Sequence, residues 1–103
     1  MIHDPERVES LRARTAAQLR LVSTLEAKIK KGRSPQLELA RDSLGDIEHF
    51  YLAQLEMESR TPDEEDRWLQ TAEYVLQVWT DQLKKLDEQF KDLGPGDIEI
   101  VEE

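Results

Sequence analysis

The sequence contains no cysteine, only four glycines and four prolines, and no long run of uncharged apolar residues. The absence of cysteine excludes disulfide bonds, thiolate metal sites and a cysteine nucleophile, so this chain of 103 residues must be stabilised by packing alone. Without about 20 consecutive apolar residues, a transmembrane helix is excluded. The first residues also lack the basic and apolar regions of a secretory signal, and we expect a cytoplasmic protein.

Basic residues are outnumbered, since 14 lysines and arginines stand against 23 aspartates and glutamates, for a net charge of −9. This balance opposes binding to nucleic acid or to an anionic membrane and favours another protein with a basic surface as partner. The charge is unevenly distributed, because residues 1–33 carry a net charge of +4 and residues 34–103 carry −13. Two interpretations stay open: the basic segment lies against the acidic remainder inside the fold, or the acidic remainder faces a basic partner.

The few prolines and glycines mark the ends of three helices. Three prolines follow a residue suited to an N-cap, in the pairs Asp4-Pro5, Ser34-Pro35 and Thr61-Pro62. Gly32 and Gly94 stand where a left-handed C-terminal cap is expected. The sequence therefore predicts helices over residues 5–31, 35–59 and 62–93.

Apolar residues recur at alternating spacings of three and four in all three segments, as they do along one face of a packed helix. The main members of these faces are Val8, Leu11, Val22 and Leu25, then Leu37, Ala40, Leu44, Ile47, Tyr51 and Leu55, then Leu69, Ala72, Leu76, Trp79, Leu83, Leu86, Phe90 and Leu93. Because the connections are short, sequential helices should run antiparallel. We predict an all-α fold over residues 1–94, an antiparallel up-down-up three-helix bundle with long helices.

Two runs of charge coincide with predicted helix ends. Residues 63–66 are all acidic and fall in the first turn of the third helix, whereas Lys28, Lys30 and Lys31 fall in the last turn of the first. The helix dipole favours anions at the N-terminus and cations at the C-terminus. Both runs are therefore interpreted as helix-stabilising.

The second helix carries an additional apolar row formed by Leu39, Phe50 and Met57, about a third of a turn from its main face. A helix that contacts two neighbours needs a wide apolar arc, so this row could belong to the core. It could instead form a contact surface for another protein or for a homodimer. Three other apolar residues fall outside every arc and are expected to be singly exposed: Leu21, Leu52 and Val78.

The last residues change in character. Gly94, Pro95 and Gly96 end the helical pattern, and the residues that follow are β-branched and acidic in partial alternation. Because a single strand is not stable alone in water, we expect residues 95–103 to form a flexible, extended acidic tail. The alternative is that the tail adds a strand to a partner's sheet through Ile98, Ile100 and Val101.

Two groups of residues could carry chemistry. Asp46 and His49 form a D-x-x-H pattern whose spacing resembles the Glu-x-x-His ligand pair of di-metal helical bundles, but the helical wheel places both away from the apolar face. Arg7 and Arg14 stand one heptad apart and could line an anion pocket, although such side chains often cover the core with their stems. His3 lies at a chain end that we expect to be frayed.

The sequence contains no glycine-rich phosphate loop, nucleophile elbow or zinc-protease motif. We therefore predict no catalytic residues, no metal and no cofactor. The favoured function is a non-enzymatic protein–protein interaction module, such as a small adaptor, inhibitor or assembly factor, with a homodimer as one form. The alternative is a helical enzyme or metal-binding protein that uses Asp46 and His49 or an anion pocket at Arg7 and Arg14.

Overall fold

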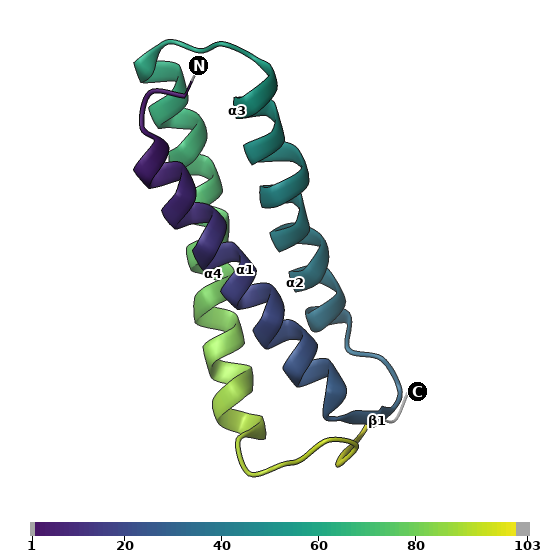
Figure 1. The fold of residues 1–103 in the computed structure, drawn as a ribbon. Helices are drawn as coiled ribbons and strands as arrows, with labels where there is room; N and C mark the ends of the chain where they lie inside the picture. The colour runs from purple at the N-terminus through teal and green to yellow at the C-terminus, as the bar shows by residue number, and fades with distance from the viewer. Residues whose placement is uncertain (1, 101–103) are drawn as a thin grey trace.

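The computed structural model describes residues 2–100 as three helical rods that lie side by side, with a small parallel sheet at one end (Figure 1). The elements are α1 (Pro5–Ala27), β1 (Ile29–Lys31), α2 (Pro35–Asp46), the π-helix η1 (Ile47–Leu52), α3 (Ala53–Met57), α4 (Pro62–Phe90) and β2 (Ile98–Glu99). The prediction of a mostly helical chain is confirmed. Of the helices in residues 2–100, none has the length and apolar character needed to span a membrane.

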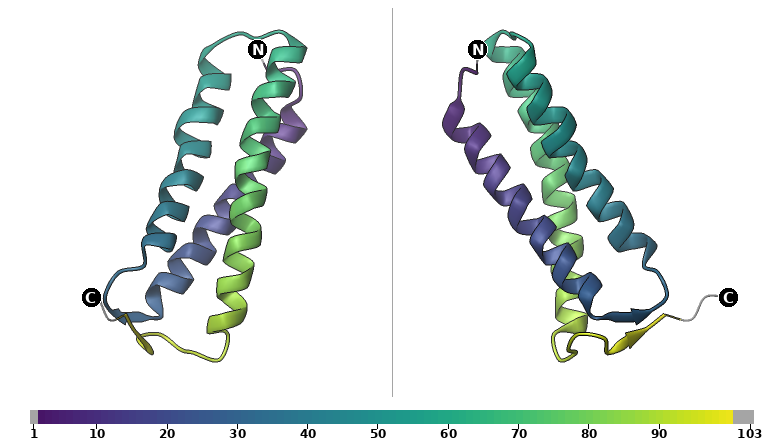
Figure 2. Two further views of the ribbon diagram at one scale, coloured as in Figure 1. Left: turned by 180° about the vertical axis from the view of Figure 1, so that it is seen from behind. Right: turned by 45° about the vertical axis from the view of Figure 1, so that its right-hand side comes forward.

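The second rod is continuous, because α2, η1 and α3 follow one another without a break. Along the chain, α1 and α4 both lead towards the end of the molecule that carries β1, whereas the second rod leads away from it (Figures 1 and 2). The resulting shape is elongated, with extents of 49 × 24 × 16 Å.

The three predicted helix starts are confirmed by their N-caps. The side chains of Asp4, Ser34 and Thr61 each accept a hydrogen bond from the backbone N–H three residues later, at 3.1, 3.3 and 3.2 Å. A proline follows each cap at the first helical position, where it removes no helical hydrogen bond. These starts are fixed by residues adjacent in sequence.

The first helix ends at Ala27, four residues before its predicted end, and residues 29–31 form β1 instead. The reason is a distant segment, since the carbonyls of Ala27, Lys28 and Lys31 accept hydrogen bonds from backbone N–H groups of residues 96–100. The interpretation of the lysine run as the last turn of this helix is therefore wrong. Lys28 Nζ donates instead to the carbonyl of Phe90, 2.8 Å away at the end of α4.

The third rod ends at Phe90 rather than at residue 93, and Leu93 is exposed. Gly94 is predicted to be the left-handed C-terminal cap, but its φ is not positive. The left-handed residue is Gly96, two positions later, with φ +77°. The amide of Asp97 donates to the carbonyl of Gly94 at 3.2 Å, which closes a turn with proline and then a left-handed glycine at its centre. This arrangement matches a type II turn and directs the chain towards β1.

Fourteen buried apolar residues form one core between the rods: Val8, Leu11, Val22, Leu25, Leu37, Ala40, Leu44, Ile47, Leu52, Leu55, Leu69, Ala72, Leu76 and Leu83. All but one belong to the predicted apolar faces. Leu21, predicted to be exposed, packs partly against the core, whereas Val78 is exposed as predicted.

The remaining core residue, Leu52, was predicted to lie on the surface and is only 1% exposed. Residues 47–52 form a π-helix, in which each N–H bonds to the carbonyl five residues earlier. The residue that returns to the inner face after Ile47 is therefore the fifth, Leu52, rather than the fourth, Tyr51, which is only half-buried. The prediction for Leu52 is wrong because it assumed a regular α-helical period.

Candidate interaction surface

The additional apolar row on the second rod is exposed. Leu39, Phe50 and Met57 retain 56%, 50% and 78% of their accessible surface. The interpretation of these residues as core is therefore wrong, and the structure leaves the row on the outside of the fold.

The centre of this row is held in place by aromatic contacts. The ring of Phe50 lies 5.4 Å from Tyr51 and 5.7 Å from Trp68 between centroids, and Tyr51 lies 5.3 Å from Trp68. Trp68 Nε1 also donates to the carbonyl of Tyr51 at 2.8 Å, which ties α4 to η1. Phe50 is consequently fixed on one side and open on the other, as a preorganised binding residue would be.

Arg60 supports the same cluster, although it belongs to no recognisable sequence motif. Its guanidinium carbon lies 4.5 Å above the Trp68 ring, and its Nη1 donates to the carbonyl of Gln54 at 2.9 Å. Its side chain is only 12% exposed. Arg60 therefore joins the end of α3 to α4 through a cation–π contact and a helix C-terminal hydrogen bond.

The second predicted binding segment lies at the other end of the molecule. The amides of Gly96, Ile98 and Ile100 donate to the carbonyls of Ala27, Lys28 and Lys31 at 3.1, 2.8 and 2.8 Å. Strands β1 and β2 pair in parallel, with Ile29 opposite Ile98.

This pairing differs from the expected tail without contacts, since Ile98 and Ile100 are half-buried while Asp97 and Glu99 are exposed. The physical reason is that β1 supplies the hydrogen-bonding partner that a single strand lacks. Val101, the third predicted binding residue of the tail, lies outside the described residues.

Docking of the tail depends on Gly32. This residue has φ +96°, and a Cβ placed on it would stand 2.4 Å from the carbonyl oxygen of Ile100 and 2.7 Å from its Cβ. Any residue other than glycine would place its Cβ too close to Ile100.

We predict that Gly32→Ala separates Ile100 from Lys31 and exposes the amides of Ile98 and Ile100 to hydrogen exchange, with a loss of about 1–2 kcal/mol from backbone strain. The control is Gly94→Ala, because a Cβ at Gly94 meets only Asp97 Oδ2 at an ordinary 3.4 Å. Exchange at these amides that is equally slow in the wild type and in Gly32→Ala would contradict the docked position of the tail.

The proposed anion-binding residue Arg7 is already paired. Its Nη1 donates to Asp66 at 2.6 Å, and its Nε and Nη2 donate to the two oxygens of Glu73 at 3.1 and 2.6 Å. The hydrogen bonds to Glu73 and Asp66 raise the pKa of the guanidinium above its ordinary value. Arg14, its predicted companion, is exposed.

Two further ion pairs join the first two rods. Arg12 Nη2 lies 2.7 Å from Glu56, which raises the pKa of Arg12, and Arg41 pairs with Glu26. The pairs of Arg7 and Arg12 favour internal pairing as the role of the basic first helix, whereas the Arg41–Glu26 pair has the opposite polarity. A surface pair contributes only about 0–1 kcal/mol.

Asp46 and His49 border a shallow surface hollow together with Leu19, Arg41, Asp42 and Gly45. Within residues 2–100, no group of three or more acidic or histidine side chains is arranged to hold a metal ion. The pair is thus exposed on the outer side of the second rod, as the helical wheel indicated.

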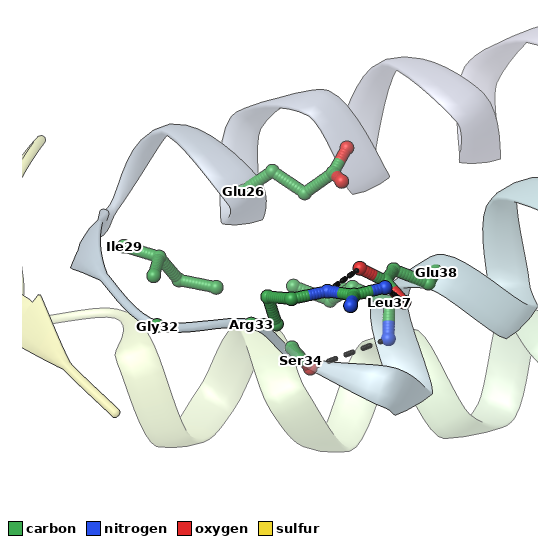
Figure 3. Close-up of a pocket in the computed structure, with 7 residues that line it drawn as sticks. All are labelled: Glu26, Ile29, Gly32, Arg33, Ser34, Leu37 and Glu38. Atoms are coloured by element: carbon green, nitrogen blue, oxygen red, sulfur yellow. Dashed lines mark hydrogen bonds and ion pairs between the residues drawn. The ribbon is translucent and has the colours of Figure 1, made fainter. Parts of the chain in front are cut away.

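A smaller pocket of about 160 Å³ lies between the end of α1 and the start of α2 (Figure 3). Arg33 donates to both carboxylate oxygens of Glu38 at 2.8 and 2.9 Å, and hydrogen bonding to Arg33 lowers the pKa of Glu38. Glu26, across the pocket, pairs with Arg41. Each charged side chain that lines this pocket is therefore engaged in an ion pair.

In comparisons with known proteins, no family model, no curated protein and no solved structure matches this chain. A proposal of function must therefore come from its own residues.

Proposed function

We propose that this chain is an antiparallel, up-down-up three-helix bundle that acts as a non-enzymatic protein–protein interaction module. An adaptor, an inhibitor and an assembly factor are all forms of such a module. The observation that carries the proposal is the exposed row of Leu39, Phe50 and Met57 along one rod.

The energetics of this row support the proposal. Full burial of a large apolar side chain contributes about 1.5–3 kcal/mol relative to an exposed one. Because each residue of the row keeps half or more of its surface in contact with water, much of this stabilisation is available to a partner. Phe50 is already ordered by Tyr51 and Trp68, so a partner loses less conformational entropy on binding it.

The enzymatic and metal-binding alternatives have weaker support. Arg7 is engaged by Asp66 and Glu73, which leaves it little capacity for an external anion. Asp46 and His49 face an open hollow, whereas acid–base chemistry needs a site that positions substrate and excludes water.

Site-specific photo-crosslinking tests the proposal. A photoreactive amino acid is placed at Leu39 or Met57 in the row, and at Ala13, an exposed position of α1, as the control. In the protein's native cells, we expect the two row positions to give the same discrete protein adduct and the control position to give none. Adducts that form equally at all three positions, or at none, would contradict the proposal.

A further inference from the structure

Helix α4 also carries two exposed large apolar residues four positions apart, Tyr74 and Val78, which retain 71% and 38% of their accessible surface. The position of Val78 relative to the row follows from a contact between the rods: Gln36 Nε2 of α2 donates to Gln82 Oε1 of α4 at 3.4 Å. Residues three or four apart share a helix face, so Leu39 lies on the side of Gln36, and Val78 lies on the side of Gln82.

A second contact fixes the direction of this surface. Gln36 contacts Gln82, and Phe50 contacts Trp68, so higher residue numbers on the second rod lie beside lower residue numbers on α4. Leu39 and Val78 therefore stand at one level of the molecule and Phe50 and Trp68 at another. Leu39 and Phe50 are eleven residues apart, about 16 Å along a helix. We call the surface formed by Leu39, Phe50 and Val78 the α2–α4 face.

The charges on this face indicate what covers it. Asp46 is exposed and lies one heptad after Leu39 on the same side of α2, and Asp42 lies one turn before Asp46. Within residues 2–100, no hydrogen bond or ion pair is made by either carboxylate. Arg67 and Lys85 lie one heptad before Tyr74 and after Val78, on the α4 border. The face is thus acidic along α2 and basic along α4.

We infer that the α2–α4 face binds an amphipathic helix of another protein, whose apolar residues cover Leu39, Phe50 and Val78 and whose basic edge meets Asp42 and Asp46. This inference rests on the proposed function and names its partner class and surface.

A helix suits this surface because the side-chain ridges of a third helix can pack into the grooves between side chains of two adjacent rods. A length of about 16 Å corresponds to three turns of a bound helix, enough for four or five apolar contacts at helical spacing. A second copy of the chain is disfavoured as the occupant, because two molecules with a net charge of −9 repel each other.

The test uses two synthetic helical peptides of about five turns, a length sufficient to cover the face. Both carry leucine at helical spacing and uncharged glutamine along one flank, and the other flank holds lysine in one peptide and glutamate in the other. Each is titrated into the isotope-labelled protein, and amide shifts are recorded by NMR. We expect the lysine peptide to shift amides of residues 39–50 and 68–82, and Leu39→Asp to weaken its binding about tenfold or more.

Charge-reversal substitutions distinguish binding at this site from a general effect of the protein's net charge. Asp46→Lys should weaken the lysine peptide and strengthen the glutamate peptide, whereas Glu88→Lys, an exposed position of α4 with the same change in charge, should alter neither by more than about twofold.

Equal weakening by Asp46→Lys and Glu88→Lys, shifts outside the α2–α4 face, or no binding of the lysine peptide would overturn the inference. A dimer in light scattering that Leu39→Asp converts to monomer would also overturn it. A protein adduct at position 39 in cells without binding of the lysine peptide would contradict this inference but not the proposed function. Absence of the adduct would contradict both.

Discussion

Replacing Leu52 with alanine should lower the free energy of unfolding by about 2–5 kcal/mol, whereas Leu39→Ala should change it by less than about 0.5 kcal/mol. Both substitutions remove the same atoms from the same rod. They differ in burial, because Leu52 is 1% exposed and Leu39 is 56% exposed. The π-helix is the cause, since it turns Leu52 towards the core and leaves a cavity if the side chain is shortened.

Urea denaturation of the two variants measures this difference. A nearly neutral Leu52→Ala would mean that residues 47–52 form a regular α-helix with Leu52 on its surface, and would contradict the register of the second rod. Equal slopes of the unfolding transition in both variants would show that the change lies in stability rather than in compactness.

Glu65→Ala should lower stability by about 2–3 kcal/mol. Glu65 is 3% exposed, and its carboxylate accepts hydrogen bonds from the amide of His3, at 2.9 and 3.0 Å to its two oxygens, and from the amide of Asp4 at 2.9 Å. Hydrogen bonds to a charged group contribute about 1.5–3 kcal/mol each, and part of this returns when the freed amides bind water.

The matched control is Asp63→Ala, which removes the same charge from an exposed position in the same helical turn. It should cost at most about 1 kcal/mol, the usual size of a helix-dipole effect. Hydrogen exchange at the amides of His3 and Asp4 gives a second measurement, and only Glu65→Ala should accelerate it. Equal losses in both variants would show that Glu65 acts through its charge alone.

Glu65 and His3 differ from the expectations that their sequence context supports. The helix dipole alone accounts for an acidic run over residues 63–66, and a residue as close to the chain end as His3 is expected to be frayed. In the structure, His3 Nε2 lies 2.7 Å from the carbonyl of Arg60, and its amide meets Glu65. A contact between residues about 60 positions apart leaves no local pattern in the sequence.

The helix starts could be predicted because their causes are local: the N-cap and the proline after it are adjacent in sequence. The helix ends could not. The end of α1 depends on Ile98 and Ile100, which supply a strand partner, and Lys28 serves the end of α4 rather than its own helix.

The candidate surface was partly predictable for a similar reason. Helical spacing places Leu39, Phe50 and Met57 beside the main apolar face, but whether such a row is core or surface depends on where the neighbouring rods lie. The supporting role of Arg60 also depends on the approach of Trp68 from another helix.

The most direct test of the central claim, that the exposed row binds a partner without supporting the fold, combines Leu39→Asp with cross-linking from position 57. We expect the thermal midpoint to stay within about 3 °C of the wild type and the protein adduct at position 57 to disappear. An adduct that persists in a fully folded Leu39→Asp variant would contradict the claim.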